Sequence, residues 1–226
     1  LQPRDRITLV PVVKDYQGDF SRAGFFSGLA QRIENSTPIG QRPNLIRIDG
    51  VAEAPGPYPL VSGMDAAELL TLADLNGDPA SLLTVLERRG TQNRLDVSIF
   101  KVSDLLDGEA KLALAPGDRL SVIPAGSRLD KSAVVSISEI NRAAFFANLA
   151  DRVRTATPIG ERPKLIQIDG AADAPGTYPL VPEMGVAEML GLADLKGDPS
   201  GLLTVLERRG QKNTIQVSVM RVSDLL

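Results

Sequence analysis

The order of apolar and polar residues along the chain predicts a mixture of helices and strands. Between residues 21 and 35, the apolar positions recur at the spacing of an amphipathic helix. These positions are Phe25, Phe26, Leu29 and Ile33. The rest of the pattern predicts a strand, a second strand, a helix, two further strands, a helical turn and a last strand. In that order, these elements cover residues 45–49, 58–61, 64–75, 84–88, 95–101, 102–106 and 119–124. Consecutive pairs of strands separated by a helix, rather than single strands that alternate with helices, predict an α+β fold.

The same pattern occurs twice in the chain. Residues 22–106 align with residues 142–226 without a gap, and more than half of the aligned positions are identical. Shared blocks include TPIG, APG and LLTVLERRG. An ungapped internal repeat of this kind predicts two copies of one fold.

The two ends of the chain differ in what they carry of the repeat. The first copy continues through a Pro-Gly-Asp turn into the strand at residues 119–124, whereas the second copy reaches Leu226 before that point. Residues 1–11 are a recognisable version of the same turn and strand. We therefore expect the chain to be a piece of a longer array of repeats, with three parts. They are the trailing strand of a preceding repeat (1–13), a first helix with its β unit (14–130), and a second helix with a unit that lacks its last strand (131–226).

Composition excludes several kinds of chemistry. The 226-residue chain has no His and no Cys, so imidazole and thiolate nucleophiles, their metal sites and disulfides are all excluded. Its 25 Lys and Arg residues against 28 Asp and Glu residues give a formal net charge of −3. That balance provides no electrostatic footprint for nucleic acid. The longest apolar stretch, residues 7–13, is too short to span a bilayer.

Two segments resemble a known family. IRIDGVAEAPGPYPLVSGMDAAELLTLADL, at residues 46–75, resembles the opening of an SLBB (soluble-ligand-binding β-grasp) domain: a strand, an APGxYPL turn and a GM entry into a helix. LAPGDRLSVIP, at residues 114–124, is similar to the L-x-PGD turn and final strand of the same domain. The resemblance covers most of both repeats and implies tandem β-grasp-like (SLBB) domains, each with an additional helix.

Tandem SLBB domains occur chiefly in outer-membrane polysaccharide export proteins. The resemblance implies a non-enzymatic periplasmic module of a capsule or exopolysaccharide export protein, which mediates domain and subunit packing and makes weak glycan contact. Association with the outer membrane would come through parts outside this chain. The partners would be further copies or neighbouring SLBB repeats, a polysaccharide, and inner-membrane components of polysaccharide biosynthesis, but no nucleic acid. The alternative is a β-grasp protein that captures a small soluble ligand or an oligosaccharide; no cofactor is expected in either case.

Tyrosine and arginine side chains are the candidate ligand-binding groups. Tyr58 and Tyr178 follow the Pro-Gly turns, where an exposed ring could stack on a sugar; packing of the ring across the hairpin is the alternative. Two Arg-Arg pairs stand at strand ends, where they could bind acidic sugars or form salt bridges at a solvated edge. These are Arg88, Arg89, Arg208 and Arg209.

Phenylalanine pairs on the two predicted helices are candidate interface residues. They are Phe25 with Phe26 and Phe145 with Phe146. Neighbouring helical side chains point about 100° apart, so one ring can join its own core while the other contacts a neighbour; burial of both in one core is the alternative. Ile7 and Leu9 are the other interface candidates. A sheet one strand short exposes backbone groups that another strand satisfies, and we expect residues 4–11 to supply that strand, within the chain or from a neighbour.

Acidic residues give little support to metal or glycosidase chemistry. Residues 74–78 open like an EF-hand loop, but Pro79 and Val85 replace the Gly and Glu that the loop needs. Two carboxylate pairs flank turns, and they are Asp49 with Glu53 and Asp169 with Asp173. A glycosidase holds two such acids in a cleft, and nothing else in the sequence indicates one. The sequence therefore favours a protein without a metal site and without enzymatic activity.

Overall fold

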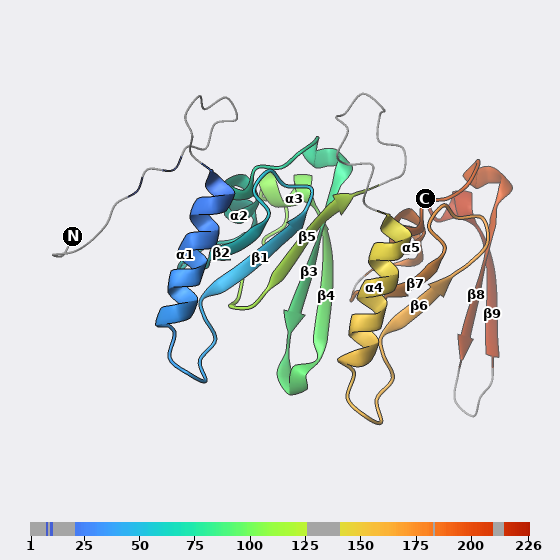
Figure 1. Ribbon diagram of the computed structural model, residues 1–226. Coiled ribbons are helices and arrows are strands. Elements are labelled where there is room, and N and C mark those ends of the chain that lie inside the picture. The colour runs from blue at the N-terminus through green and yellow to red at the C-terminus, as the bar shows by residue number, and fades with distance from the viewer. Residues whose placement is uncertain (1–7, 9, 11–20, 126–140, 183, 210–214) are drawn as a thin grey trace.

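The protein has two copies of one set of helices and strands, which lie side by side (Figure 1). The computed structural model describes residues 8, 10, 21–125, 141–182, 184–209 and 215–226. Within this part of the chain, the structure is a mixed α+β fold with a mixed sheet. The α+β class that the sequence pattern predicts is confirmed.

The first unit contains three helices and five strands. Helix α1 begins after Ser21, whose hydroxyl accepts a hydrogen bond from the backbone N–H of Gly24. The helices are α1 (Arg22–Ser36), α2 (Ala66–Ala73) and α3 (Val102–Leu106), with short 3₁₀ turns at Pro79–Ser81 and Thr91–Asn93. The strands are β1 (Leu45–Gly50), β2 (Gly56–Pro59), β3 (Leu82–Arg89), β4 (Leu95–Lys101) and β5 (Arg119–Pro124).

The five strands of the first unit form one sheet in the order β2-β1-β5-β3-β4. The last strand in sequence, β5, lies at the centre of the sheet, parallel to β1 and antiparallel to β3. β5 therefore joins the β1–β2 hairpin to the β3–β4 hairpin. A unit without this strand consists of two hairpins that share no backbone pairing.

Both faces of the first sheet are apolar, since successive residues of a strand point to opposite faces and β3 and β5 are buried along most of their length. The inner face packs against α2 and α3 in the first core. Its central residues are Ile46, Ile48, Leu82, Leu86, Leu120 and Val122, with Leu69, Leu70 and Leu105 from the helices. Helix α1 lies along β2, and Val10 also packs against this core.

The opposite side of the first sheet, which we term the outer face, also carries apolar residues. They are Leu83, Val85, Val97 and Ile123. These side chains belong to a second core, which they share with the second unit. The first sheet is therefore a layer between two cores rather than the wall of one.

The second unit repeats the elements of the first up to the fourth strand. It contains α4 (Arg142–Thr155), α5 (Val186–Ala193), β6 (Leu165–Ile168), β7 (Gly176–Pro179), β8 (Leu203–Arg209) and β9 (Ile215–Arg221), with 3₁₀ turns at Pro199–Gly201 and Val222–Asp224. β6 pairs with β7, and β8 pairs with β9, in two separate two-stranded sheets. Among the described residues, no strand pairs with the other edge of β6 or of β8.

Candidate functional site

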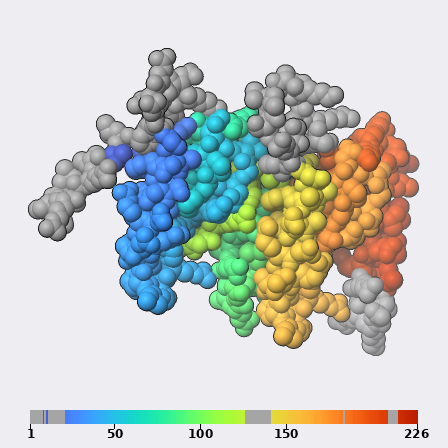
Figure 2. Space-filling view, viewed as in Figure 1, coloured from blue at the N-terminus to red at the C-terminus, as the bar shows by residue number. Residues whose placement is uncertain are grey.

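Helix α4 is packed between the two units. On one side it lies along β7 of its own unit, and on the other side it covers the outer face of the first sheet (Figures 1 and 2). The buried apolar residues of this contact are Leu83, Val85, Val97, Ile123, Phe146, Leu149 and Val153. We term this contact the inter-unit interface. Removal of so many aliphatic and aromatic groups from water is what stabilises such a contact.

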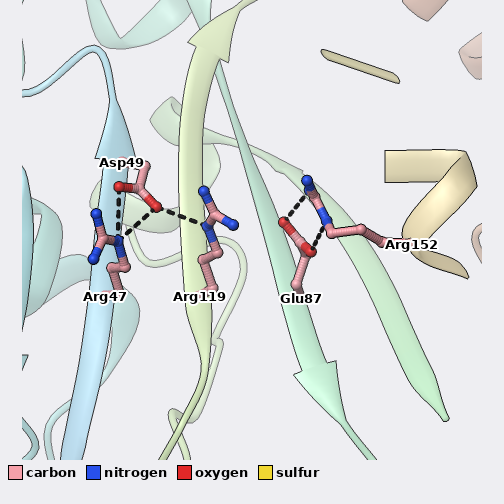
Figure 3. Close-up of polar contacts among 5 residues, drawn as sticks. All are labelled: Arg47, Asp49, Glu87, Arg119 and Arg152. Carbon is pink, nitrogen blue, oxygen red and sulfur yellow. Dashed lines mark hydrogen bonds and ion pairs between the residues drawn. The ribbon is translucent and has the colours of Figure 1, made fainter. Parts of the chain in front are cut away.

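An ion pair between Arg152 and Glu87 fixes the position of α4 on the first sheet (Figure 3). The Nε and Nη2 atoms of Arg152 donate to the two carboxylate oxygens of Glu87, at 2.9 and 2.7 Å. Glu87 comes from β3, and its side chain is only 5% exposed. A carboxylate at this depth needs a partner that satisfies both oxygens, and a planar guanidinium does so. The pair therefore sets the register of helix against sheet as well as contributing attraction.

A second ion pair crosses the same interface nearer the solvent. The guanidinium of Arg94, which follows the turn between β3 and β4, contacts the carboxylate of Glu161 in the loop before β6. Both side chains are more than a third exposed. Exposed pairs of this kind contribute little to stability, so Arg152 and Glu87 are the more informative pair.

Asp49 forms a charged cluster on the outer face, beside the apolar patch (Figure 3). Its carboxylate accepts hydrogen bonds from Nε of Arg47 at 2.9 Å and from Nε of Arg119 at 2.7 Å. Arg47 and Arg119 are register partners on the parallel strands β1 and β5. Asp49 therefore ties two adjacent strands together, and its oxygens are occupied by arginines instead of being aimed at a second acid across a cleft.

Arg88 points to the opposite face of the sheet from Glu87 and holds the Pro-Gly-Asp turn. Its Nε and Nη2 donate to the carboxylate of Asp118 at 2.9 and 2.6 Å, and Nη2 also donates to the carbonyl of Ala113. The hydrogen bond to Asp118 raises the pKa of Arg88. Asp118 is buried and also accepts from the backbone N–H of Ala115. Two of the guanidinium nitrogens of Arg88 are therefore committed to this turn, as in the salt-bridged alternative, and its glycan-binding role stays a prediction.

The other three arginines of the two Arg-Arg pairs differ from Arg88. Arg89 is exposed and donates to the side-chain amide oxygen of Asn93 at 2.7 Å. Arg208 is exposed and lines a cavity described below. The side chain of Arg209 lies outside the described residues.

Tyr58 and Tyr178 are core residues. Each is about 1% exposed, and each donates its hydroxyl proton to a backbone carbonyl four residues earlier, that of Ala54 or Ala174. Burial raises the pKa of Tyr58 to about 12 and raises that of Tyr178. The expectation that these rings stack on a sugar is wrong, because no ring face is open to solvent. They pack instead against a helix phenylalanine of the same unit.

The phenylalanine pairs lie in two different settings. Phe26 is buried against Tyr58, and Phe25 packs against the same first core. Phe146 is buried against Tyr178, and with Phe145 it belongs to the core that the second unit shares with the outer face of the first sheet. Among the described residues, the second pair participates in a core that spans both units, and the first pair packs within its own unit. The expected interface residues Ile7 and Leu9 lie outside the described residues.

A cavity of about 400 Å³ opens between β6 and β8 of the second unit. We term it the β6–β8 groove. It occupies the place that β5 has in the first unit, between the equivalents of β1 and β3. Its lining is mostly apolar and includes Ile166, Ile168, Met189, Leu206 and Val222, with Asp169 and Arg208 as its charged residues.

Sequence reasoning did not find the residues that tie the units together. Glu87 and Arg152 are far apart in sequence. The one sequence feature that could have pointed to them is that both recur in the other repeat, Glu87 as Glu207 and Arg152 as Arg32. It also missed the arginines at the start of each long helix. Arg22 pairs with Asp74, and Arg142 donates to the carbonyl of Leu192, so each binds the end of the neighbouring helix in its unit.

Comparisons with protein-family models, with curated proteins and with solved structures found no match. Within the described part of the chain, no helix combines the length and the apolar character needed to cross a bilayer. The positions of the side chains therefore carry the functional argument that follows.

Proposed function

We propose that this chain is a structural module whose repeats pack on one another in series. The observation that carries the proposal is the position of α4, whose residues Leu149, Val153 and Arg152 cover the outer face of the preceding sheet. We infer that every unit uses the same two packing surfaces: its long helix, which in the second unit contacts the unit before it, and its outer sheet face, which in the first unit contacts the unit after it. A repeat built in this way suits a role as a wall or spacer.

We further propose that the units are SLBB-type β-grasp domains of a capsule or exopolysaccharide export protein in the periplasm. Support comes from the two motifs at residues 46–75 and 114–124, and both have structural roles of the kind the resemblance implies. The first motif supplies the β1–β2 hairpin and α2, and the second supplies the Asp118 turn and the central strand β5. Outer-membrane association and contact with inner-membrane biosynthesis components belong to the same proposal.

Ligand capture is the second candidate function, and the β6–β8 groove is the observation that favours it. Its volume of about 400 Å³ lies in the range of small-molecule sites. Asp169 and Arg208 could orient a polar ligand at its rim. In the first unit, β5 occupies the corresponding position between β1 and β3.

Titration with defined glycans separates the two functions. The 226-residue chain is titrated by isothermal calorimetry with an acidic capsule-type oligosaccharide and, separately, with a neutral one. Under the packing proposal, the acidic oligosaccharide should bind weakly and in a salt-sensitive way. Saturable micromolar binding that Arg208→Gln abolishes, and that the matched exposed variant Lys111→Gln leaves unchanged, would instead support ligand capture. Detection of the parent protein in the cytosolic fraction of its own cells would reject the export role under either outcome.

A further inference from the structure

The loops at residues 37–44 and 157–164, which follow the two long helices, each carry one isoleucine at the apex of a turn. Ile39, after α1, and Ile159, after α4, are fully exposed. No other large apolar side chain in the described part of the chain is more than 65% exposed. Burial of apolar surface is what stabilises such a side chain in its own fold, and neither residue gains it. We term Ile39 and Ile159 the isoleucine tips.

A preformed turn holds the first isoleucine tip. Ile39 is the second residue of a β-turn in which the backbone N–H of Gln41 donates to the carbonyl of Pro38 at 3.1 Å. Gly40, the third residue, has a φ of 87°, as a type II turn requires. The turn is therefore in place before any contact is made, so that binding through Ile39 does not have to order the loop.

The second unit repeats this turn. The backbone N–H of Glu161 donates to the carbonyl of Pro158 at 3.1 Å, and Gly160 has a φ of 92°. The hydroxyl of Thr157 donates to the carbonyl of Val153 in α4 at 2.7 Å, and the equivalent hydrogen bond to α1 has the same length. Two separate loops thus present the same side chain in the same way.

Both loops lie at one edge of the molecule. Figure 1 shows them at the lower edge, together with the turn between β3 and β4, and Figure 2 shows them as separate projections. The strand pairing agrees, because β1 and β5 begin at this edge and β3 ends there. A flat partner can therefore contact both isoleucine tips at once.

Packing of one unit on the next does not cover the isoleucine tips. Ile39 is exposed although a unit follows its own, and Ile159 is exposed although a unit precedes its own. The ion pair between Arg94 and Glu161 brings the preceding unit into contact with the second loop, yet Ile159 stays in solvent. The exposure is thus a property of the repeat, and this edge is open to a partner outside the stack of units.

Basic residues accompany the isoleucine tips. Arg42, Arg162 and Lys164 are exposed, and none of them forms an ion pair with a described residue. The one carboxylate in the sequence of the two loops is that of Glu161, and Arg94 binds it. The loops are therefore net positive, although the whole chain has a formal net charge of −3. Such an edge attracts an anionic surface.

We propose that this edge docks on an anionic phospholipid membrane, with Ile39 and Ile159 in the interfacial layer and the basic residues against the headgroup phosphates. Apolar side chains at the boundary between headgroups and acyl chains, with cations beside them, bind proteins to membrane surfaces. A protein partner would need a separate apolar pocket for each tip, whereas a bilayer accepts any convex apolar projection. The inference goes beyond the packing role and depends neither on it nor on glycan binding.

Single tryptophans test the contact directly, because the chain has no Trp of its own. Ile39→Trp and Ile159→Trp are titrated separately with vesicles of equal parts phosphatidylglycerol and phosphatidylcholine, with and without brominated acyl chains. The emission of each should shift to shorter wavelength and be quenched by the brominated lipid. Lys101→Trp is the matched control, since Lys101 is exposed at the end of β4 away from the β3–β4 turn. Its emission should not change.

Loss of the isoleucine tips should weaken binding, as measured by co-sedimentation with the same vesicles. Ile39→Ser/Ile159→Ser should lower the partition coefficient about tenfold or more, with unchanged circular dichroism because both side chains are fully exposed. Arg42→Gln/Arg162→Gln should also lower it about tenfold or more, and Lys101→Gln should bind like the wild type.

Three results would overturn the proposal. The first is a wild-type chain that does not bind the anionic vesicles. The second is binding that survives the loss of both isoleucines, since this would be adsorption by charge alone. The third is an unshifted emission of either tip tryptophan while the protein is bound to the vesicles.

Discussion

Arg152 on α4 binds Glu87 on β3 through two parallel hydrogen bonds, and this contact links the second repeat to the sheet of the first. Its geometry is that of a guanidinium fork on a carboxylate. Helix α4, which begins the second unit, therefore also covers the outer face of the first unit's sheet. The fold is better described as a stack of alternating sheets and helices than as two independent domains.

Removal of one partner of this pair should destabilise the protein. Arg152→Met leaves the Glu87 carboxylate buried without its charge partner, and we expect a loss of about 2–4 kcal/mol in the free energy of unfolding. Urea unfolding monitored by circular dichroism measures it. Arg154→Met is the control on the same helix, since Arg154 pairs with Asp151 at an exposed site, and it should cost less than about 0.5 kcal/mol. Equal effects of the two variants would contradict a special role for Arg152.

Gly50, at the end of β1, should be required for stability, and the equivalent Gly170 in the second unit should be far less so. Gly50 and Gly170 both have positive φ, at 93° and 95°. A Cβ at Gly50 would lie 2.0 Å from the carbonyl oxygen of Val122 on β5, whereas a Cβ at Gly170 would meet no atom within 4 Å.

Gly50→Ala should therefore cost about 3 kcal/mol or more, since backbone strain and a backbone clash add, and Gly170→Ala about 1 kcal/mol in the dilute chain. Thermal unfolding of the two variants measures the difference. Similar costs for both variants would show that β5 does not approach Gly50 as described.

Alkaline pH should destabilise the protein partly through Tyr58. Burial raises the pKa of this hydroxyl from 10.0 to about 12, so the unfolded chain releases the proton at lower pH than the folded chain does. The contribution to stability is complete below about pH 10 and is lost as pH rises from about 10 to about 12, by about 3 kcal/mol in all.

Tyr58→Phe removes that pH dependence at the cost of the hydrogen bond to Ala54. We expect a loss of about 1–2 kcal/mol at pH 7 and a shallower decline of stability above pH 10 than in the wild type. Urea unfolding at a series of pH values gives both quantities. Parallel curves for the variant and the wild type above pH 10 would exclude Tyr58 as the group responsible.

Deletion of residues 1–12 should weaken association. The deletion removes Ile7 and Leu9 from the strand that the sequence predicts at residues 4–11, together with the contact of Val10 with the first core. Sedimentation velocity should show a larger dissociation constant, and thermal unfolding a modest decrease in melting temperature. If both the melting temperature and the sedimentation profile remain unchanged, residues 1–12 have neither role.

The elements of the fold were predictable from the sequence because their signals are local. The apolar spacing of residues 21–35, the Pro55-Gly56 turn and the alternation around Ile46 and Ile48 all report on neighbours in the chain. The sequence pattern also indicated that the second copy stops before its last strand. Burial of Tyr58 and Tyr178 favoured the packing alternative over the functional one, and local sequence could not decide this because a ring beside a turn can lie on either side of a hairpin.

Long-range relationships were not predictable in the same way. Glu87 looks like any charged residue at a strand end, and only the packing of α4 on the sheet shows that its side chain is buried. Arg88 has the same local sequence as Arg208, but the first binds Asp118 and the second lines the groove. The difference depends on whether a strand lies beside them, which local sequence does not encode.

The most direct test of the account is amide hydrogen exchange of β6 and β8 at low and high protein concentration. In the described structure, the edges of β6 and β8 that face the groove have no strand partner. If the strand that the sequence predicts at residues 4–11 fills this place from a neighbouring molecule, the amides on these edges should become strongly protected at high concentration, while those of β1 and β3 stay protected throughout. Equal exchange of the β6 and β8 amides at both concentrations, in a chain that keeps its fold, would contradict the account.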